Sequence, residues 1–188
     1  PEIVPASSVL ETAFGNINAV FHPPGMLMNA GWIEDTGGDF LFYREGITPA
    51  VGRVAAAVDT ERMAAAAALG VPVRSFLHGF HQAGLTTEAA MKSGDIARAC
   101  RESEPNKSIK SPPSLDHRYI HEDVGYGLVP FRALAALAGV ETPTIDALIH
   151  LATEMMDVAY LESGLTLARM GLGALAPGDL DRFVMEGA

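Results

Sequence analysis

The 188-residue sequence is long enough to bury a core as one domain or two small ones. Its apolar fraction of 48% with only 7% aromatic residues is typical of helices built from alanine, leucine, valine, isoleucine and methionine. The formal net charge of −10 argues against binding to nucleic acid or to an anionic membrane. No apolar run approaches the roughly 18 to 20 residues that span a bilayer, and the single cysteine, Cys100, suits the reducing cytoplasm.

The first predicted helix runs from Ser8 to His22. Apolar residues recur there at helical spacing, and Ser8 with Glu11 forms a capping box. Two consecutive prolines follow His22, and we expect them to end the helix because neither carries an N–H. Asn18 lies one turn earlier on the same face. The imidazole of His22 either caps the last carbonyls of its helix or is a titratable group held in a fixed position where the chain leaves the helix.

The middle of the chain predicts one strand-like segment and several helices. Residues 40–44 form the only plausible extended piece. A threonine and a proline at 48–49 then start a long helix that ends at Gly70. Capping residues at 87–88 and 93–95 predict the starts of two short helices.

A long polar loop divides the chain. Residues 102–116 contain prolines and no hydrophobic period, and unstructured loops of this length often have a function. The next residues, 116–127, are dense in titratable side chains and then turn-forming. A helix over 128–138 follows, and a threonine–proline pair at 142–143 starts a second long helix with an apolar stripe as far as Ala159.

Two short helices over 165–170 and 179–185 complete the predicted elements. Eight or so helices with at most one short strand predict an all-α fold, a multi-helical domain packed around its two long central helices. We expect residues 1–188 to form a single domain.

The sequence offers little support for a nucleotide loop or a metal site. The glycines of residues 171–173 follow a helix and lack a third glycine, so we do not expect the chain to bind a dinucleotide by itself. His78 and His81 are three apart, and His117 and His121 are four apart, but neither pair belongs to a recognised zinc-binding order. We therefore predict no metal and interpret these histidines as solvated.

General acid–base chemistry by His22 is the alternative with more support. An imidazole exchanges a proton best when an acceptor holds its other ring nitrogen, and Asp123 is a short carboxylate placed just before the turn at Gly125. Arg118 offers a planar fork that could clamp a carboxylate. Spacing alone leaves open that Arg118 and Asp123 only form a local surface pair.

Three motifs follow one another along the chain. The first is Asn18-x-x-x-His22-Pro23 with Leu27-Met28-Asn29 and Ile33-Glu34. The second is Arg118-Tyr119-x-x-Glu122-Asp123-Val124-x-Tyr126-Gly127-Leu128-Val129-Pro130. The third is Thr142-Pro143-Thr144-Ile145-Asp146. Together they resemble the opine dehydrogenase family, and more narrowly the C-terminal helical domain of the octopine/nopaline dehydrogenase-like enzymes, whose fold is similar to the C-terminal domain of 6-phosphogluconate dehydrogenase.

This resemblance implies a substrate-binding and catalytic domain for the NAD(P)H-dependent reductive condensation of an amino acid with a 2-oxo acid. His22 would be the acid/base residue and Asp123 would orient it, while Asn18 would hydrogen-bond the reacting groups and Arg118 would bind a substrate carboxylate. The resemblance also implies that NAD or NADP binds mainly to an N-terminal Rossmann domain absent from these 188 residues, which alone would be inactive. A homodimer is a further expectation.

Two other interpretations remain open at this stage. Ketopantoate reductase and 6-phosphogluconate dehydrogenase relatives also have helical domains, but their chemistry favours a lysine, and Lys92, Lys107 and Lys110 all lie in polar segments. A non-catalytic all-α dimerisation or scaffold domain would leave every candidate residue without a role. If His22 and Asp123 lie beyond hydrogen-bond reach of each other, the catalytic interpretation fails.

Overall fold

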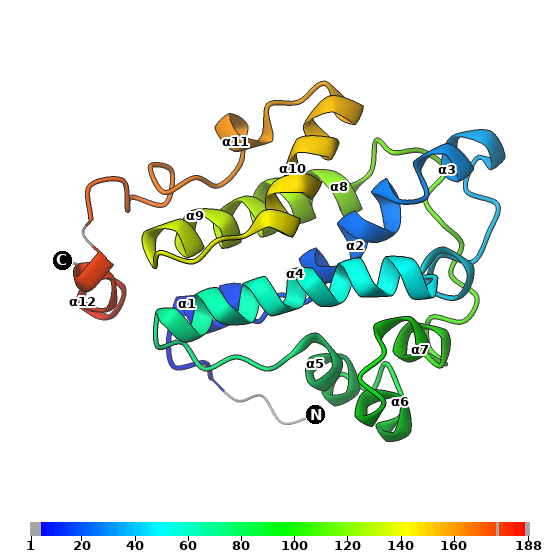
Figure 1. Cartoon of the computed structure of the whole chain (residues 1–188), viewed down its shortest axis with the longest axis horizontal. Helices are drawn as coiled ribbons and strands as arrows, with labels where there is room; N and C mark the ends of the chain where they lie inside the picture. The colour runs from blue at the N-terminus through cyan, green and yellow to red at the C-terminus, as the bar shows by residue number, and fades with distance from the viewer. Residues whose placement is uncertain (1–4, 176, 187–188) are drawn as a thin grey trace.

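The longest helix crosses the middle of the molecule, and other helices pack on its two sides (Figure 1). The computed structural model describes residues 5–175 and 177–186. In Figure 1, α4 lies between α9 and α10 on one side and α5, α6 and α7 on the other. The helices of the described residues are α1 (Val9–Phe14), α2 (Asn18–Leu27), α3 (Ala30–Thr36), α4 (Pro49–Ala68), α5 (Phe76–Gln82), α6 (Glu88–Lys92), α7 (Ile96–Arg101), α8 (Arg118–Asp123), α9 (Val129–Leu137), α10 (Pro143–Met156), α11 (Tyr160–Ser163) and α12 (Leu180–Glu186).

Three shorter turns of helix complete the fold. They are the π-helices η1 (Phe42–Gly46) and η2 (Val124–Leu128) and the 3₁₀-helix η3 (Pro177–Asp179). In the described ranges there is no strand, only an isolated bridge between Leu41 and Lys110, so the predicted all-α fold is confirmed. No helix in this part of the chain is long and apolar enough to cross a membrane.

The two long helices begin where the sequence predicts. The hydroxyl of Thr48 accepts the N–H of Val51, and Gly70, at a φ of +69°, lies just beyond the end of α4. α10 begins after Thr142, but the cap comes from α4 instead: the carboxylate of Glu61 accepts the N–H groups of residues 144 and 145, at 2.8 and 2.9 Å. One long helix therefore fixes the start of the other.

The prediction of one helix ending at His22 is wrong. The chain breaks after α1, near Gly15, and α2 then continues through Pro23 and Pro24 to Leu27, which leaves His22 in mid-helix. The prolines cannot donate to the carbonyls one turn earlier, a defect that costs about 3 kcal/mol in an exposed helix. Every residue of α2 after the first is buried, and this packing outweighs the local preference.

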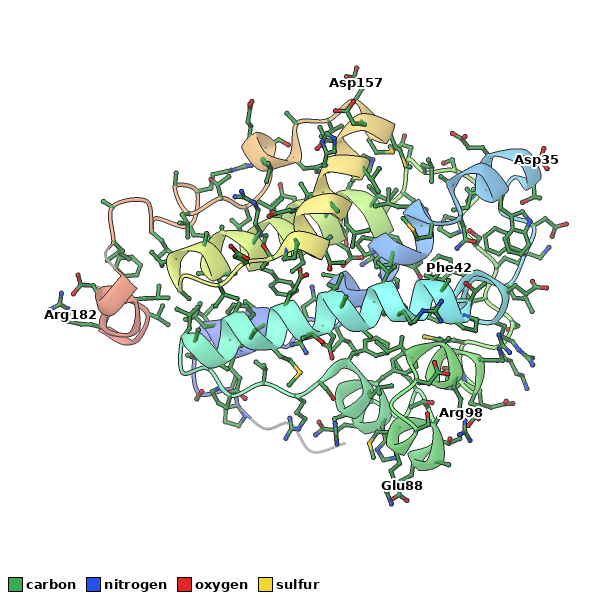
Figure 2. All side chains as sticks on the ribbon, in the orientation of Figure 1. Asp35, Phe42, Glu88, Arg98, Asp157 and Arg182 are labelled. Carbon is green, nitrogen blue, oxygen red and sulfur yellow. The ribbon has the colours of Figure 1, made fainter. Side chains whose placement is uncertain are left out.

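The strand predicted over residues 40–44 is also wrong. Neighbouring residues of a strand point to opposite faces, whereas Phe42 and Tyr43 are both buried because the chain turns into η1 there. Figure 2 shows Phe42 inside the molecule, while charged side chains such as Asp35 and Glu88 point outward.

The C-terminal segment matches the prediction in part. Residues 165–170 form turns instead of the predicted helix, and α11 lies just before them. The helix predicted over 179–185 is present as α12.

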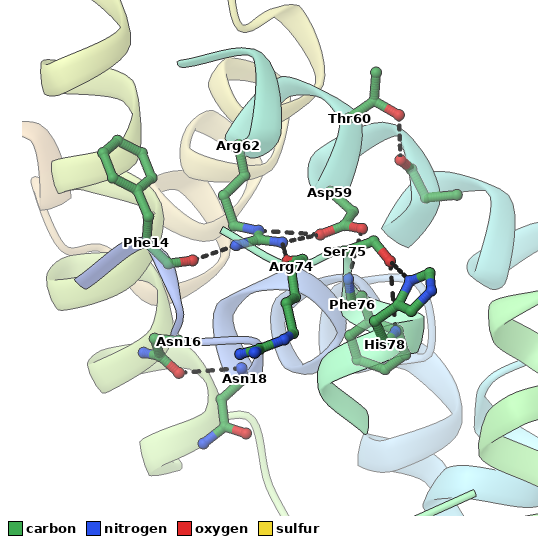
Figure 3. A network of polar contacts seen from close by, with 11 residues as sticks. Phe14, Asn16, Asn18, Asp59, Thr60, Arg62, Arg74, Ser75, Phe76 and His78 are labelled. Carbon is green, nitrogen blue, oxygen red and sulfur yellow. Dashed lines mark hydrogen bonds and ion pairs between the residues drawn. The ribbon is translucent and has the colours of Figure 1, made fainter. Parts of the chain in front are cut away.

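A buried arginine on α4 joins three segments of the chain (Figure 3). Arg62 is fully buried and donates to Asp59 Oδ1, 2.6 Å from Nη2, to the carbonyl of Phe14, and to the carbonyl of Arg74 at 2.6 Å. The second oxygen of Asp59 accepts the N–H of Phe76 at 2.8 Å. This cluster fixes the end of α1 and the start of α5 against α4.

We expect Arg62→Ala to lower the free energy of unfolding by about 3 to 5 kcal/mol, because it removes the donor to the buried Oδ1 of Asp59 and to the carbonyls of Phe14 and Arg74. Urea denaturation measures the change. The control is Arg98→Ala, which removes an exposed pair with Glu102 and should lower the free energy of unfolding much less. Equal losses in the two variants would show that the cluster adds nothing beyond a surface ion pair.

Candidate active site

The imidazole of His22 and the carboxylate of Asp123 meet between α2 and the last residue of α8. His22 Nδ1 lies 2.8 Å from Asp123 Oδ2, although the residues are 101 apart in the sequence. The side chains are 6% and 10% exposed, so little water competes for the bond. An ionised carboxylate only accepts hydrogen bonds, so Nδ1 carries the proton and Nε2 is left with its lone pair. The pairing predicted from the sequence is therefore present in the fold.

Burial is the largest influence on the proton affinity of His22. It lowers the pKa of the imidazole below its ordinary value, because the charged form loses its hydration. The hydrogen bond and charge of Asp123 act in the opposite direction, and the charge of Arg118 lowers the pKa further. His22 is accordingly a neutral base that Asp123 makes easier to protonate.

Aromatic rings enclose the imidazole. The ring of Tyr119 stacks on it with centroids 3.6 Å apart and planes at 11°, and the ring of Phe21 lies 4.3 Å away. The hydroxyl of Tyr43 lies 3.5 Å from Nε2. The sequence predicted a role for neither tyrosine. Tyr119 stands beside Arg118 in the segment dense in titratable side chains, but Tyr43 lies where a strand was predicted.

Arg118 is the first residue of α8 and is exposed. Its guanidinium pairs with Glu122, with Nη2 3.0 Å from Oε2, and not with Asp123. The alternative that Arg118 forms a local pair with Asp123 is therefore wrong. Side chains four residues apart lie together on one face of a helix, whereas Asp123 is five residues from Arg118. With 66% of its side chain exposed, Arg118 is accessible to an anion from solvent.

Asn18 is the first residue of α2 and is exposed. Its backbone N–H bonds the side-chain oxygen of Asn16 at 3.1 Å, and Figure 3 shows its side chain directed away from the Arg62 cluster. The structure places Asn18 one turn before His22 as expected, but the described contacts include no hydrogen bond between the two side chains.

Two other histidines form side-chain hydrogen bonds. His78 bonds the hydroxyl of Ser75, and His121 lies between Asp116 at 2.9 Å and Tyr160 at 2.8 Å. Among the residues with a described position, no group of three or more His, Cys, Asp or Glu side chains is arranged to hold a metal. Two cavities, of about 610 and 560 Å³, lie beside α1 and are lined by other residues than the His22 site.

Sequence comparisons match most of the chain. A family model described as the alpha-helical domain of NAD/NADP octopine/nopaline dehydrogenase matches residues 5–156. Opine dehydrogenase of Arthrobacter sp. (strain 1C) is 37% identical over 175 residues, which cover 93% of this chain and 47% of that protein. Vitopine synthase of Allorhizobium ampelinum is 32% identical over 169 residues, covering 87% of this chain and 44% of that protein. The chain thus spans about half the length of the curated relatives it matches.

The fold is similar to that of solved octopine dehydrogenase structures. The complex with NADH and L-arginine gives a TM-score of 0.68 at 22% identity and covers 90% of this chain and 49% of that chain. The complex with NADH and agmatine gives 0.65 at 21% identity and covers 92% and 48%. The helical architecture therefore recurs in both.

We expect Asp123→Asn to lower the pKa of His22 further, because an amide removes the charge that stabilises the imidazolium. An NMR titration of the His22 ring protons measures this. Asp116→Asn, which removes the partner of a different histidine, should leave the His22 titration unchanged. A pKa of His22 that stays constant or rises in Asp123→Asn would count against the pairing.

Proposed function

The chain belongs to the NAD/NADP octopine/nopaline dehydrogenase family, whose alpha-helical domain it contains, and on that premise we propose that it is the substrate-binding and catalytic part of an opine dehydrogenase. The proposed reaction joins the α-amine of an amino acid to the carbonyl carbon of a 2-oxo acid. Loss of water gives an imine, and reduction of the imine gives a secondary amine with two carboxylate-bearing arms. The observation that carries this proposal is the buried bond between His22 and Asp123.

His22 is the acid and base of this scheme. With Nδ1–H donated to Asp123, Nε2 accepts a proton to become an imidazolium that the carboxylate stabilises. In the direction of condensation, the carbonyl oxygen takes one proton from the attacking amine and one from Nε2–H, and it leaves as water with formation of the protonated imine. In the direction of oxidation, Nε2 takes the proton back from the water that attacks the imine. Asp123 keeps the ring in one tautomer and orientation throughout.

Arg118 and Asn18 are the proposed substrate-binding residues. The guanidinium of Arg118 binds a substrate carboxylate with two parallel hydrogen bonds, in place of its present bond to Glu122. This explains how a chain with a net charge of −10 binds an acid. Asn18 lies one turn before His22 on α2, from where its amide hydrogen-bonds the reacting groups once the substrate is bound.

The cofactor belongs mainly to another part of the enzyme. The described residues form helices without the strand, glycine loop and helix that hold a dinucleotide, so they do not fit this group by themselves. NAD(P)H supplies the hydride from an N-terminal Rossmann domain that these 188 residues do not include. The isolated chain is therefore inactive in this scheme. A homodimer, and a cytoplasmic location that suits the single buried thiol of Cys100, complete the proposal.

The competing interpretations lose support. The family match favours opine dehydrogenases over the ketopantoate reductase and 6-phosphogluconate dehydrogenase relatives. A scaffold domain has no need for a buried imidazole–carboxylate pair, which costs desolvation without adding apolar packing.

In the full-length enzyme, we expect His22→Ala to lower the rate of imine reduction at least 100-fold, because general acid–base catalysis contributes about this much. The affinity for NAD(P)H should stay close to parental. Steady-state kinetics and fluorescence titration measure the two properties. The exposed His150→Ala is the matched control and should keep its activity. Loss of nucleotide binding in His22→Ala would contradict the assignment of the cofactor to a separate domain.

Arg118→Ala is expected to raise the KM for one carboxylate substrate by about 10-fold or more, as expected for a charged hydrogen bond. Arg98→Ala is the control, because Arg98 forms the same kind of i,i+4 pair, with Glu102. A KM that does not change for either substrate would remove Arg118 from the binding site.

A further inference from the structure

Tyr43 is a buried polar group that the proposed mechanism leaves without a role. Its side chain belongs to η1, and the residue is only 6% exposed. Its hydroxyl lies 3.5 Å from Nε2 of His22, the nitrogen that Asp123 leaves free to exchange a proton. The hydroxyl and the exchangeable nitrogen therefore face each other.

The distance between these two atoms is informative. Hydrogen bonds between a hydroxyl and a ring nitrogen or oxygen are commonly about 2.7 to 3.0 Å long, so 3.5 Å is a weak contact. Two donors this far apart can both reach a single oxygen at about 2.8 Å from each, with the oxygen at the third corner of the triangle. The spacing suits one shared acceptor better than a direct bond.

Tyr43 is also held in its donor form. Burial raises the pKa of its phenol far above the ordinary value, and the neighbouring hydroxyl of Tyr119 and the charge of Asp123 raise it further. When His22 is protonated, Nε2–H is a second donor. An acceptor that binds here meets one N–H and one O–H group, while Asp123 is engaged at the opposite nitrogen of the ring.

The surrounding rings fix this geometry before a substrate arrives. Tyr119 stacks on the imidazole, and the rings of Phe21 and Phe42 lie 5.6 and 5.4 Å from that of Tyr43. These packed rings restrict rotation of both side chains. Donors that do not have to reorganise are the ones that stabilise a developing oxyanion most effectively.

We propose that Tyr43 is a further catalytic residue, whose hydroxyl and His22 Nε2–H together bind the carbonyl oxygen of the 2-oxo acid. This inference rests on the proposed opine dehydrogenase function and assigns the site of one substrate atom within it. The pair polarises the carbonyl towards attack by the amine, and His22 alone transfers the proton, so Tyr43 keeps its own.

The test compares the full-length enzyme with Tyr43→Phe, which removes one oxygen and keeps the ring. The assay follows NADH or NADPH oxidation with pyruvate and the amino acid that gives the fastest rate. We expect kcat/KM for pyruvate to fall by about 10- to 100-fold, the effect of losing one donor to a developing charge. The KM for the amino acid, the nucleotide affinity and the melting temperature should stay close to parental. Tyr126→Phe, at an exposed tyrosine, is the matched control and should behave as parental.

Three other outcomes are possible, and each would contradict the role of Tyr43 or the proposed function. A parental enzyme that oxidises neither cofactor with any tested pair of 2-oxo acid and amino acid would overturn the proposed function and this inference with it. An active parental enzyme with unchanged kcat/KM for pyruvate in Tyr43→Phe would overturn the role of Tyr43 alone. A variant that loses amino acid affinity, nucleotide affinity and melting temperature together would show that Tyr43 only supports the fold, which also overturns its role.

Discussion

The hydrogen bond between His22 and Asp123 constrains the helices that carry it. A buried carboxylate without a partner costs several kcal/mol, so α2 and α8 have to meet within a few tenths of an ångström, as their 2.8 Å bond requires. Helix α4 packs against α2 directly, and it reaches α8 through α9 and η2. The Arg62 cluster ties the end of α1, just before α2, to the same helix. The central helix α4 therefore positions both helices that carry the His22–Asp123 pair.

Two glycines allow the approach that the site needs. A Cβ on Gly127 would lie 2.5 Å from the Cβ of Ala19, and a Cβ on Gly25 would lie 2.6 Å from Cζ of Phe42. Helix α2 can therefore touch η2 on one side and η1 on the other. The first contact brings the end of α8 to His22, and the second brings the segment of Tyr43 beside its ring. The two π-helices thus position the groups on either side of one imidazole.

Local chemistry in the sequence predicted some of these features and could not predict others. Side-chain caps mark helix starts within a few residues, which is why Thr48, Thr87 and Asp95 predicted α4, α6 and α7 correctly. The path of α2 through two prolines depends on burial against distant helices, which no local pattern contains. The order of the motifs identified His22 and Asp123. Residue spacing cannot predict their contact, because they are far apart in the sequence. Tyr43 was missed because its segment was predicted as a strand, so the direction of its side chain was unknown.

The charges around His22 link substrate binding to protonation in the proposed reaction. Arg118 is paired with Glu122, and its positive charge contributes to the lowered pKa of His22. A carboxylate that binds Arg118 brings a negative charge near the imidazole, and this favours the protonated ring. By reciprocity, a protonated His22 strengthens the binding of that carboxylate. In the proposed reaction, binding of the acid substrate and protonation of His22 would therefore support each other, and an imidazole whose pKa burial lowers would become the proton donor when the substrate binds.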